Sequence, residues 1–335
     1  MIRGVELENF RGIRRTATPL ELSKFTVLIG RNGVGKSSIV EALFFMPPNP
    51  LTIPSVPFPL LDKDALLSKI HGNLGRNFLY GGGDRALVKL RMDNGEVELR
   101  ILENAPIEAT EGFCSALSRQ IVACVKPGEF GKLAEALGIE PKAISNYSLM
   151  ISGDARWQEA LFRQFEDSRV WELVERSGIH YKLVKELSDE GLVPERFTEM
   201  VLLSGTLKIR REIGGRPHYL SPDDISAGLR SFLIARLAVE MVKPRLILWD
   251  DFEANVHPSL LSYMLKWLGS LDAQVVIATH SIDVLYELAV GGQVDEYGVV
   301  RLKKDANDEL SAEVLQEDEL LAHFQGNIDP RIVEG

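Results

Sequence analysis

Two apolar runs near the start of the chain differ in pattern. Apolar and polar residues alternate over residues 2–10, as in a strand with one buried face. Residues 22–29 are more continuously apolar, as in a parallel strand that is covered on both faces. A glycine-rich turn follows, and we expect a helix over residues 36–45. The pattern therefore predicts a strand, a buried strand, a tight turn and a helix.

The middle of the chain is less regular. Residues 46–59 contain six prolines, too many for a helix or a central strand, so we expect an extended loop there. Residues 85–103 predict a β-hairpin, because alternating strands flank the turn sequence DNG at 93–95. Apolar residues at helical spacing between 157 and 187 predict one or two short helices.

The last part of the chain alternates between strands and helices. Strands are expected over residues 198–220, with a break at the glycine pair 214–215. A helix, a strand, a helix, a strand and a helix follow over residues 225–242, 245–249, 258–271, 274–278 and 282–288. Such alternation implies a mostly parallel sheet with helices on both faces. The predicted fold class is therefore α/β, with an antiparallel β subdomain and a short helical insertion.

Composition and charge narrow the possible functions. The chain has 335 residues, of which 45% are apolar and 26% charged, so it can build a large core. Its net charge of −10 argues against a protein that binds nucleic acid with its whole surface. Residues 1–60 nevertheless carry seven Lys and Arg against four Asp and Glu. Arg11, Arg14 and Arg15 are close together there, either as solvated charges or as contacts to the phosphates of a nucleotide or DNA.

The sequence also indicates a compartment. Cys114 and Cys124 are the only cysteines and lack metal-ligand spacing, so we expect two buried thiols in a reducing compartment rather than a disulfide framework. The N-terminus is too polar for a signal peptide, and no run of about 18 uncharged apolar residues occurs. These features predict a cytoplasmic protein without a membrane partner.

The clearest chemical signal is the sequence GRNGVGKS at residues 30–37. Glycines permit a tight turn whose backbone N–H groups surround phosphate oxygens, and the helix start adds partial positive charge. Lys36 can reach the β- and γ-phosphates of ATP, and Ser37 can bind Mg²⁺. We therefore predict a nucleotide-binding loop. Its candidate residues are Gly30, Arg31, Asn32, Gly33, Gly35, Lys36, Ser37 and Ser38.

Two later strand ends carry polar groups that suit the same site. The apolar run at 245–249 leads into Asp250 and Asp251, at the sheet edge where α/β proteins bind ligands. Asp250 is the candidate Mg²⁺ ligand together with Ser37, and Asp251 is placed to orient the attacking water. The next strand leads into His280, which can contact the γ-phosphate or that water, although an ordinary structural histidine remains an alternative.

The order of these motifs resembles the ABC-type ATPase heads of the SMC/RecF/RecN group and the related OLD-like AAA ATPases. ENFRGIR at 8–14, which contains Arg11, is similar to their first strand, and GRNGVGKSS is similar to their phosphate loop. WDDFEANVHP and ATHS are similar to their acidic segment and their switch-histidine loop. SPDDISAGLR resembles their signature motif, with Ser226 and Gly228 as implied nucleotide contacts. The similarity covers roughly residues 1–45 and 198–290.

The resemblance implies a P-loop NTPase of the ABC/SMC-head type. Lobe I would comprise residues 1–154, and lobe II would comprise residues 198–335. Between them, residues 155–197 would form a short helical insertion in place of a coiled-coil arm. Two heads would enclose two ATP molecules, each bound by the phosphate loop of one chain and by Ser226 and Gly228 of the other. ATP would then hold the dimer together, and its hydrolysis would release it.

The sequence departs from the family pattern at two functional positions. Asp251 stands where the family has its catalytic glutamate, so slow hydrolysis is expected, with Glu253 as the next candidate base. The family's glutamine loop has no clear match, and Ser152 or Gln120 occupies its expected place.

The leading hypothesis is an ATPase head that dimerises around ATP and Mg²⁺ and acts in DNA maintenance, repair or defence. Its expected partners are a second copy of the chain, double-stranded DNA and a separate nuclease. A slow ATP-dependent regulatory switch without DNA is the second hypothesis. The ATPase subunit of a transporter is the third, and the diverged signature and missing glutamine argue against it.

Overall fold

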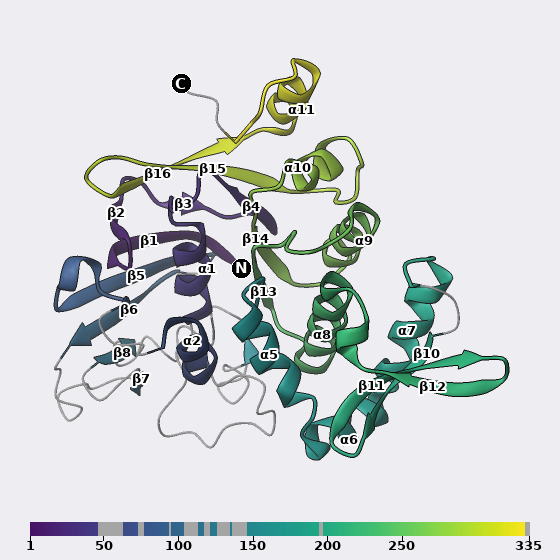
Figure 1. Cartoon of the computed structure of the whole chain (residues 1–335). Helices are drawn as coiled ribbons and strands as arrows, with labels where there is room; N and C mark the ends of the chain where they lie inside the picture. Colours follow the sequence, from purple (N-terminus) through teal and green to yellow (C-terminus); the bar gives the residue numbers. More distant parts are fainter. Residues whose placement is uncertain are drawn as a thin grey trace.

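A computed structural model describes most of the chain (Figure 1). The described residues are 1–45, 63–72, 77–93, 95–103, 113–116, 121–125, 135, 146–193 and 197–331. The segment predicted as a proline-rich loop, residues 46–59, and the candidate Gln120 lie outside them.

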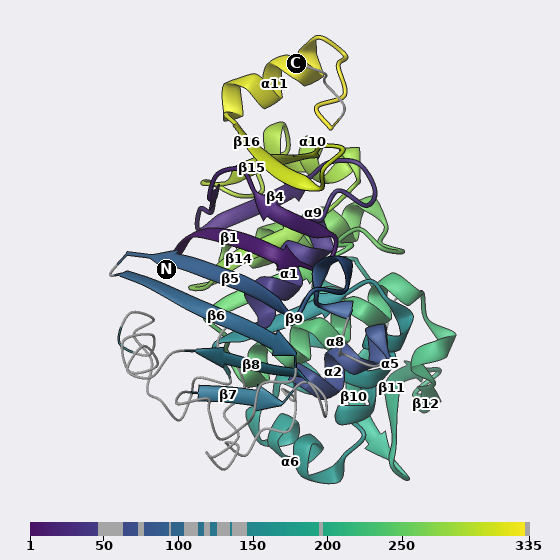
Figure 2. The same ribbon diagram turned by 90° about the vertical axis from the view of Figure 1, so that its left-hand side faces the viewer.

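Within the described residues, thirteen strands form one sheet with a parallel and an antiparallel part, in the order β7-β8-β6-β5-β1-β2-β16-β15-β4-β14-β13-β9, with β3 paired to β1. The parallel part consists of β15 (Gly298–Lys304), β4 (Phe25–Ile29), β14 (Gln274–Ala278), β13 (Leu246–Asp250) and β9 (Ser148–Ser152). The remaining strands are β1 (Ile2–Phe10), β2 (Ile13–Thr16), β3 (Leu20–Glu21), β5 (Arg85–Met92), β6 (Gly95–Glu103), β7 (Phe113–Ala116), β8 (Ile121–Val125) and β16 (Glu309–Leu315). Figure 2 shows β1, β5, β6 and β8 as neighbouring strands below β15 and β16.

Helices and a second, smaller sheet complete the fold (Figure 1). The helices are α1 (Lys36–Phe45), α2 (Lys63–His71), α5 (Ala155–Gln164), α6 (Ser168–Ser177), α7 (Ile179–Asp189), α8 (Ala227–Val242), α9 (Pro258–Gly269), α10 (Ile282–Ala289) and α11 (Glu317–Gln325), with short 3₁₀ turns at Tyr80–Gly82 and Pro222–Asp224. The smaller sheet is antiparallel and consists of β10 (Phe197–Leu203), β11 (Thr206–Ile213) and β12 (Arg216–Leu220).

Alternation along the buried strands divides the interior into two cores. In β13, Ile247 and Trp249 belong to the core formed with α8, α9 and α10, whereas Leu246 and Leu248 belong to the core formed with α1 and β1. Successive side chains of a strand point to opposite faces, so a strand that is apolar at every position serves two cores at once. In keeping with this, β4, β13 and β14 are buried at every position.

The α/β fold class predicted from the sequence is confirmed, with a large sheet, helices on both faces of its parallel part and an antiparallel region. Residues 155–189 form three helices where one or two were expected. The hairpin of β15 and β16 and the following α11 were not predicted. Among the described residues, no helix is both long and apolar enough to cross a membrane. The proposed lobe boundaries at 154 and 197 stay predictions.

The expectation for the two cysteines was wrong, because Cys124 is disulfide-bonded. Cys114 is the only other cysteine, and the antiparallel pairing of β7 with β8 places it directly opposite Cys124. Residues opposite one another in an antiparallel pair have Cα atoms about 4.5–5.5 Å apart, within the range of a disulfide. The sequence spacing did not reveal this strand register.

Gln274 links the start of β14 to the antiparallel part of the sheet. It is 5% exposed, and its side-chain oxygen accepts a hydrogen bond from the backbone N–H of Ile2 at 3.0 Å. Its side-chain nitrogen donates to the carbonyls of Ile2 at 2.7 Å and Ser23 at 3.0 Å. Because Ile2 opens β1, these bonds fix the first strand against the parallel strands, and without them buried backbone groups lose their partners.

We predict that Gln274→Leu lowers the free energy of unfolding by about 2–3 kcal/mol, because it removes three hydrogen bonds to backbone groups, two of them buried. Urea denaturation measures this change. Gln293→Leu is the control, since Gln293 is only half-buried and donates to the carbonyl of the exposed Gly291, two residues away. We expect the control to change stability by less than about 0.5 kcal/mol. Equal effects of the two substitutions would contradict the role given to Gln274.

Candidate nucleotide-binding site

The predicted phosphate loop connects β4 to α1. Gly30 leaves the strand with a φ of 140°, a conformation that favours glycine. A Cβ atom at Gly30 would lie 2.7 Å from the carbonyl oxygen of Leu302 in β15. The neighbouring strand therefore requires glycine at the first position of the loop. Gly30, Arg31, Asn32, Gly33 and Gly35 lie before α1, and Lys36, Ser37 and Ser38 form its first turn.

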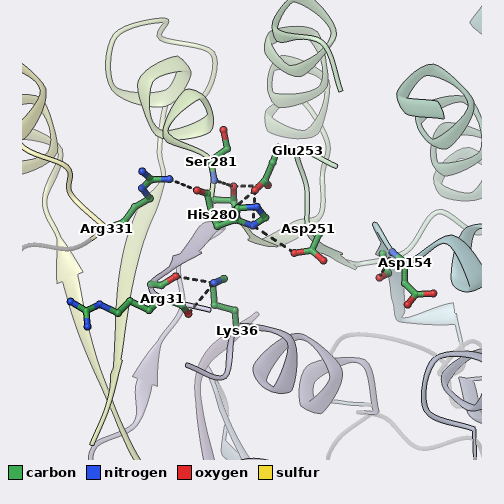
Figure 3. Close-up of polar contacts among 11 residues, drawn as sticks. Arg31, Lys36, Asp154, Asp251, Glu253, His280, Ser281 and Arg331 are labelled. Atoms are coloured by element: carbon green, nitrogen blue, oxygen red, sulfur yellow. Dashed lines mark hydrogen bonds and ion pairs between the residues drawn. The ribbon is translucent and has the colours of Figure 1, made fainter. Parts of the chain in front are cut away.

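Lys36 folds back over this loop (Figure 3). Its ammonium group donates to the carbonyl oxygens of Gly30 at 2.9 Å and Arg31 at 3.4 Å, and the residue is only 8% exposed. Burial lowers the pKa of Lys36, while the carboxylates of Asp250, Asp251 and Glu253, at and after the end of β13, oppose that shift. The positively charged ammonium group therefore lies beside the backbone of the loop, where the sequence predicted a contact to phosphate.

Asp250 is the last residue of β13 and is 7% exposed. Burial raises the pKa of Asp250 to about 7, and a hydrogen bond with Ser37 works in the opposite direction. Among the described residues, the Oδ1 atom of Asp250 has no hydrogen-bond partner. A buried carboxylate oxygen without a partner favours a bound cation, which stabilises the charged form.

Asp250 and Ser37 therefore fit a magnesium site. Mg²⁺ in nucleotide sites takes one or two protein ligands and completes its shell with phosphate and water. The described part of the chain has no group of three or more His, Cys, Asp or Glu side chains that could hold a metal ion.

Asp251 and His280 lie on the open side of the site (Figure 3). Asp251 has a φ of 51°, uncommon for a residue with a side chain, and its carboxylate is 52% exposed. One of its oxygens is 3.9 Å from Nδ1 of His280, whose side chain is 57% exposed. The two side chains that the sequence assigned to water and γ-phosphate therefore adjoin each other and remain accessible.

Glu253 holds the histidine loop. Its Oε2 accepts a hydrogen bond from the hydroxyl of Thr279 at 2.6 Å, and its Oε1 accepts one from the backbone N–H of His280 at 2.9 Å. The same Oε1 is 3.0 Å from Nδ1 of His280, and the carboxylate side chain is 14% exposed. Because both oxygens are engaged, this geometry favours a positioning role for Glu253 over the role of a base.

The signature segment is exposed to solvent at one position and buried in the core at another. Ser226 is exposed and caps α8 by accepting a hydrogen bond from the N–H of Leu229 at 3.4 Å. Gly228 is buried, and a Cβ atom there would lie 2.2 Å from the carbonyl oxygen of Asn255. Gly228 is therefore required for packing against the turn that follows Asp251. Within the described part of the chain, no hydrogen bond joins Ser226 or Gly228 to residues 30–38.

The three arginines near the N-terminus all have acidic partners. Arg11 lies 2.7 Å from an oxygen of Glu41 in α1. Arg14 and Arg15 lie 3.6 and 2.8 Å from an oxygen of Glu309 in β16. The phosphate contacts predicted for these arginines therefore compete with ion pairs inside the protein.

Sequence reasoning missed two side chains beside the site. Ser152, at the end of β9, is paired in register with Asp250, and the amide of Gln158 donates to the Ser152 carbonyl at 3.1 Å. A glutamine thus lies near the expected glutamine loop, six positions beyond Ser152. Arg331 donates a hydrogen bond to the carbonyl oxygen of His280 (Figure 3). No local motif links residues 51 positions apart, so this contact left no signal in the sequence.

Two family models match the chain. Residues 1–131 match "AAA ATPase domain", and residues 136–286 match "AAA domain, putative AbiEii toxin, Type IV TA system". A curated relative, the DNA double-strand break repair Rad50 ATPase of Sulfolobus acidocaldarius, is 23% identical over 208 residues. That alignment covers 56% of this chain but only 20% of the relative.

Two solved structures have a similar fold. The SMC head bound to the C-terminal winged-helix domain of ScpA has a TM-score of 0.55 and 14% identity, covering 94% of this chain and 97% of that one. The SMC head with an extended coiled coil from Pyrococcus furiosus, bound to the C-terminal domain of ScpA, has a TM-score of 0.51 and 12% identity, with coverage of 97% and 99%. At these identities the likeness concerns the fold. The chain is therefore similar to AAA-type ATPase domains over residues 1–131 and 136–286, and it has the fold of SMC head domains.

Proposed function

We propose that this head binds ATP with Mg²⁺, dimerises around it and hydrolyses it slowly. The observation that carries the proposal is the convergence of three strand ends on one edge of the sheet. The loop after β4 leads to Lys36, β13 ends at Asp250 and is followed by Asp251, and His280 follows β14. The carboxyl edge of a parallel sheet is where α/β proteins bind their ligands.

Each side chain has a proposed task in phosphoryl transfer. The loop N–H groups and the Lys36 ammonium bind the β- and γ-phosphates. Ser37 and Asp250 would hold Mg²⁺, which neutralises charge on the phosphate oxygens when bound. Asp251 orients the attacking water through its exposed carboxylate. With Nδ1 turned toward Glu253, the other ring nitrogen of His280, Nε2, is left to contact the γ-phosphate.

Slow turnover is proposed because the group that orients the water is an aspartate. Its side chain is one methylene shorter than glutamate, and Glu253, the nearby glutamate, has both oxygens engaged. A regulatory switch with little turnover remains the competing proposal. Steady-state ATP hydrolysis with and without DNA separates the two, since only a DNA-dependent head should change its rate when DNA is added.

Dimerisation is proposed because the start of α8 is open. Ser226 and Ala227 are exposed, and a helix start offers partial positive charge to an anion. None of the hydrogen bonds among described residues connects this segment to the chain's own phosphate loop, and the ligand proposed for it is the nucleotide of a second copy. The second copy is thus the first proposed partner, ahead of double-stranded DNA and a separate nuclease.

A role with DNA is proposed from the Rad50 relative, and the charges favour one place for the contact. β11 and β12 form a ribbon that projects beside α6 and α7 (Figure 1). Lys208, Arg211 and Arg216 on this ribbon form no salt bridge with any described residue, unlike Arg14 and Arg15. Unpaired cations can neutralise backbone phosphates, so we place the DNA contact on the ribbon.

We predict that Lys36→Ala abolishes ATP binding while the protein stays folded, because the ammonium supplies charge to phosphates. Thermal unfolding with ATP–Mg²⁺ measures this: at about 100 times the dissociation constant, ATP should stabilise the wild type by about 2.7 kcal/mol and the variant not at all. Lys24→Ala, at an exposed lysine before β4, should respond like the wild type. Stabilisation that survives Lys36→Ala would disprove the phosphate-loop assignment.

We predict that Asp251→Asn traps an ATP-bound dimer, because binding persists while water is no longer oriented. Turnover should fall by about 10²-fold or more. Light scattering with ATP–Mg²⁺ should show a long-lived dimer for this variant and a monomer for Ser226→Arg, whose bulk blocks the partner's nucleotide. Asp272→Asn is the matched control, since its side chain is 97% exposed and pairs only loosely with Arg245 at 3.7 Å. A wild type that stays monomeric at saturating ATP would refute the dimer.

We predict that Arg211→Glu with Arg216→Glu weakens binding of double-stranded DNA at low salt. Fluorescence anisotropy across a salt series should show a slope reduced by about 0.9 for each DNA phosphate that the protein no longer neutralises. The pair Arg14→Glu and Arg15→Glu is the comparison and should have the smaller effect, since Glu309 already pairs with both arginines. The opposite ranking would move the DNA contact to the N-terminal arginines.

A further inference from the structure

The last described residues of the chain reach the histidine loop. Residues 329–331, here named the C-terminal hook, follow α11. The carboxylate of Asp329 accepts hydrogen bonds from the Arg331 backbone N–H at 2.9 Å and from its Nε at 2.8 Å, and Arg331 Nη2 donates to the same carboxylate at 2.5 Å. The remaining nitrogen, Nη1, donates to the carbonyl oxygen of His280 (Figure 3).

The C-terminal hook is itself anchored beside the phosphate loop. Arg301 in β15 donates to the carbonyl of Pro330 at 3.1 Å and is 4% exposed. Its guanidinium also pairs with Glu313 of β16 at 2.8 Å, so its geometry is fixed by two partners. In the sheet, Arg301 is paired in register with Ile29, the residue before the loop. The buried guanidinium of Arg301, held by its two partners, therefore fixes the C-terminal hook to β15, the strand that flanks the phosphate loop.

The backbone of His280 is held from both sides. Glu253 accepts from its N–H at 2.9 Å, and Arg331 donates to its carbonyl. The imidazole is 57% exposed, so packing alone does not fix it. Two charged partners at the two backbone groups of one residue restrict the loop without touching the reactive ring nitrogen.

We propose that Arg331 is a positioning residue that fixes the His280 loop for ATP hydrolysis, an inference that rests on the proposed function. The guanidinium does not act on the nucleotide itself, because Nε and Nη2 are bound by Asp329 and Nη1 by His280. Glu253 and Asp283 lie near enough to stabilise its charge, and with Asp329, the largest cause, they raise the pKa of Arg331. The group is therefore permanently charged and acts through His280.

The same chain contains a matched control for the hook. Asp167 accepts hydrogen bonds from Arg169 in the same three-atom arrangement: the backbone N–H at 2.8 Å, Nε at 3.1 Å and Nη2 at 2.8 Å. Arg169 is 85% exposed and lies at the start of α6, outside the site. Arg169→Ala thus removes the local hook alone, and Arg331→Ala removes the hook and the contact to His280.

The experiment compares steady-state ATP hydrolysis of the wild type, Arg331→Ala and Arg169→Ala. We expect Arg331→Ala to lower kcat by about 10- to 100-fold, because a misplaced reacting group costs that much, while KM changes by less than about 2-fold. Arg169→Ala should match the wild type in both constants. A wild-type kcat for Arg331→Ala, or equal losses in the two variants, would overturn the proposal.

A double-mutant cycle separates positioning of His280 from a general structural effect. In a His280→Ala background, removing Arg331 should lower kcat no further, because two residues that act as one unit are not additive. Losses that multiply would show that Arg331 acts by another route and would overturn the proposal.

Hydrogen exchange keeps this inference distinct from the proposed function. Arg331→Ala should raise the exchange of backbone amides in residues 279–283, and Arg169→Ala should not. If the wild type does not hydrolyse ATP, the proposed function fails, yet exchange still tests whether Arg331 fixes the loop. Unchanged exchange in Arg331→Ala would overturn the inference whatever the wild type hydrolyses.

Discussion

The structure depends on the pairing of one buried carboxylate, Glu41, in the middle of α1. Glu41 is 2% exposed, and a charge buried without a partner costs about 3–5 kcal/mol. Arg11 at 2.7 Å and His71 at 2.9 Å supply the partners, one from the turn after β1 and one from the end of α2. Two segments that are distant from each other in sequence are thereby fixed to the helix that begins at the phosphate loop. The same charges act on Asp250, since Glu41 raises its pKa and Arg11 lowers it, both less strongly than burial does.

This central helix explains how the site can be organised before a nucleotide binds. Nearly every residue of α1 is buried, because it packs against β1 on one side and against β9, β13 and β14 on the other. Its first turn therefore cannot shift without disturbing the core that both parts of the sheet share. Lys36 already spans the loop from Gly30, and Ser37 already bonds Asp250. Because these groups are already in place, they need little rearrangement when the nucleotide binds. Such preorganisation is what electrostatic stabilisation of phosphoryl transfer requires.

The sequence predicted the parts of the site that depend on local order. A strand followed by a glycine-rich turn, a lysine and a serine is characteristic of a phosphate-binding loop. Acidic residues that follow another parallel strand lie at the same edge of the sheet as that loop. It could not show that Glu253 is occupied by the loop of Thr279 and His280, because that depends on how two strand ends meet. For the same reason, the sequence did not reveal the roles of Gln274, Arg301 and Arg331. Each of these side chains forms a hydrogen bond with a residue far away in the chain. The cysteine expectation was wrong because spacing says nothing of the register between β7 and β8.

The carboxylates of the site divide their tasks according to exposure. Asp250 is 7% exposed and its pKa is raised by burial, so a cation is needed to keep it charged, as the proposed metal would do. Asp251 is 52% exposed and remains free to meet water, but its short side chain leaves little reach. Glu253 has the longer side chain, but its two oxygens are engaged with Thr279 and His280. A substitution that lengthened residue 251 would thus add reach where the site lacks it, whereas shortening residue 253 would release the histidine. Exposure rather than residue type decides which of the three carboxylates can act on a water molecule.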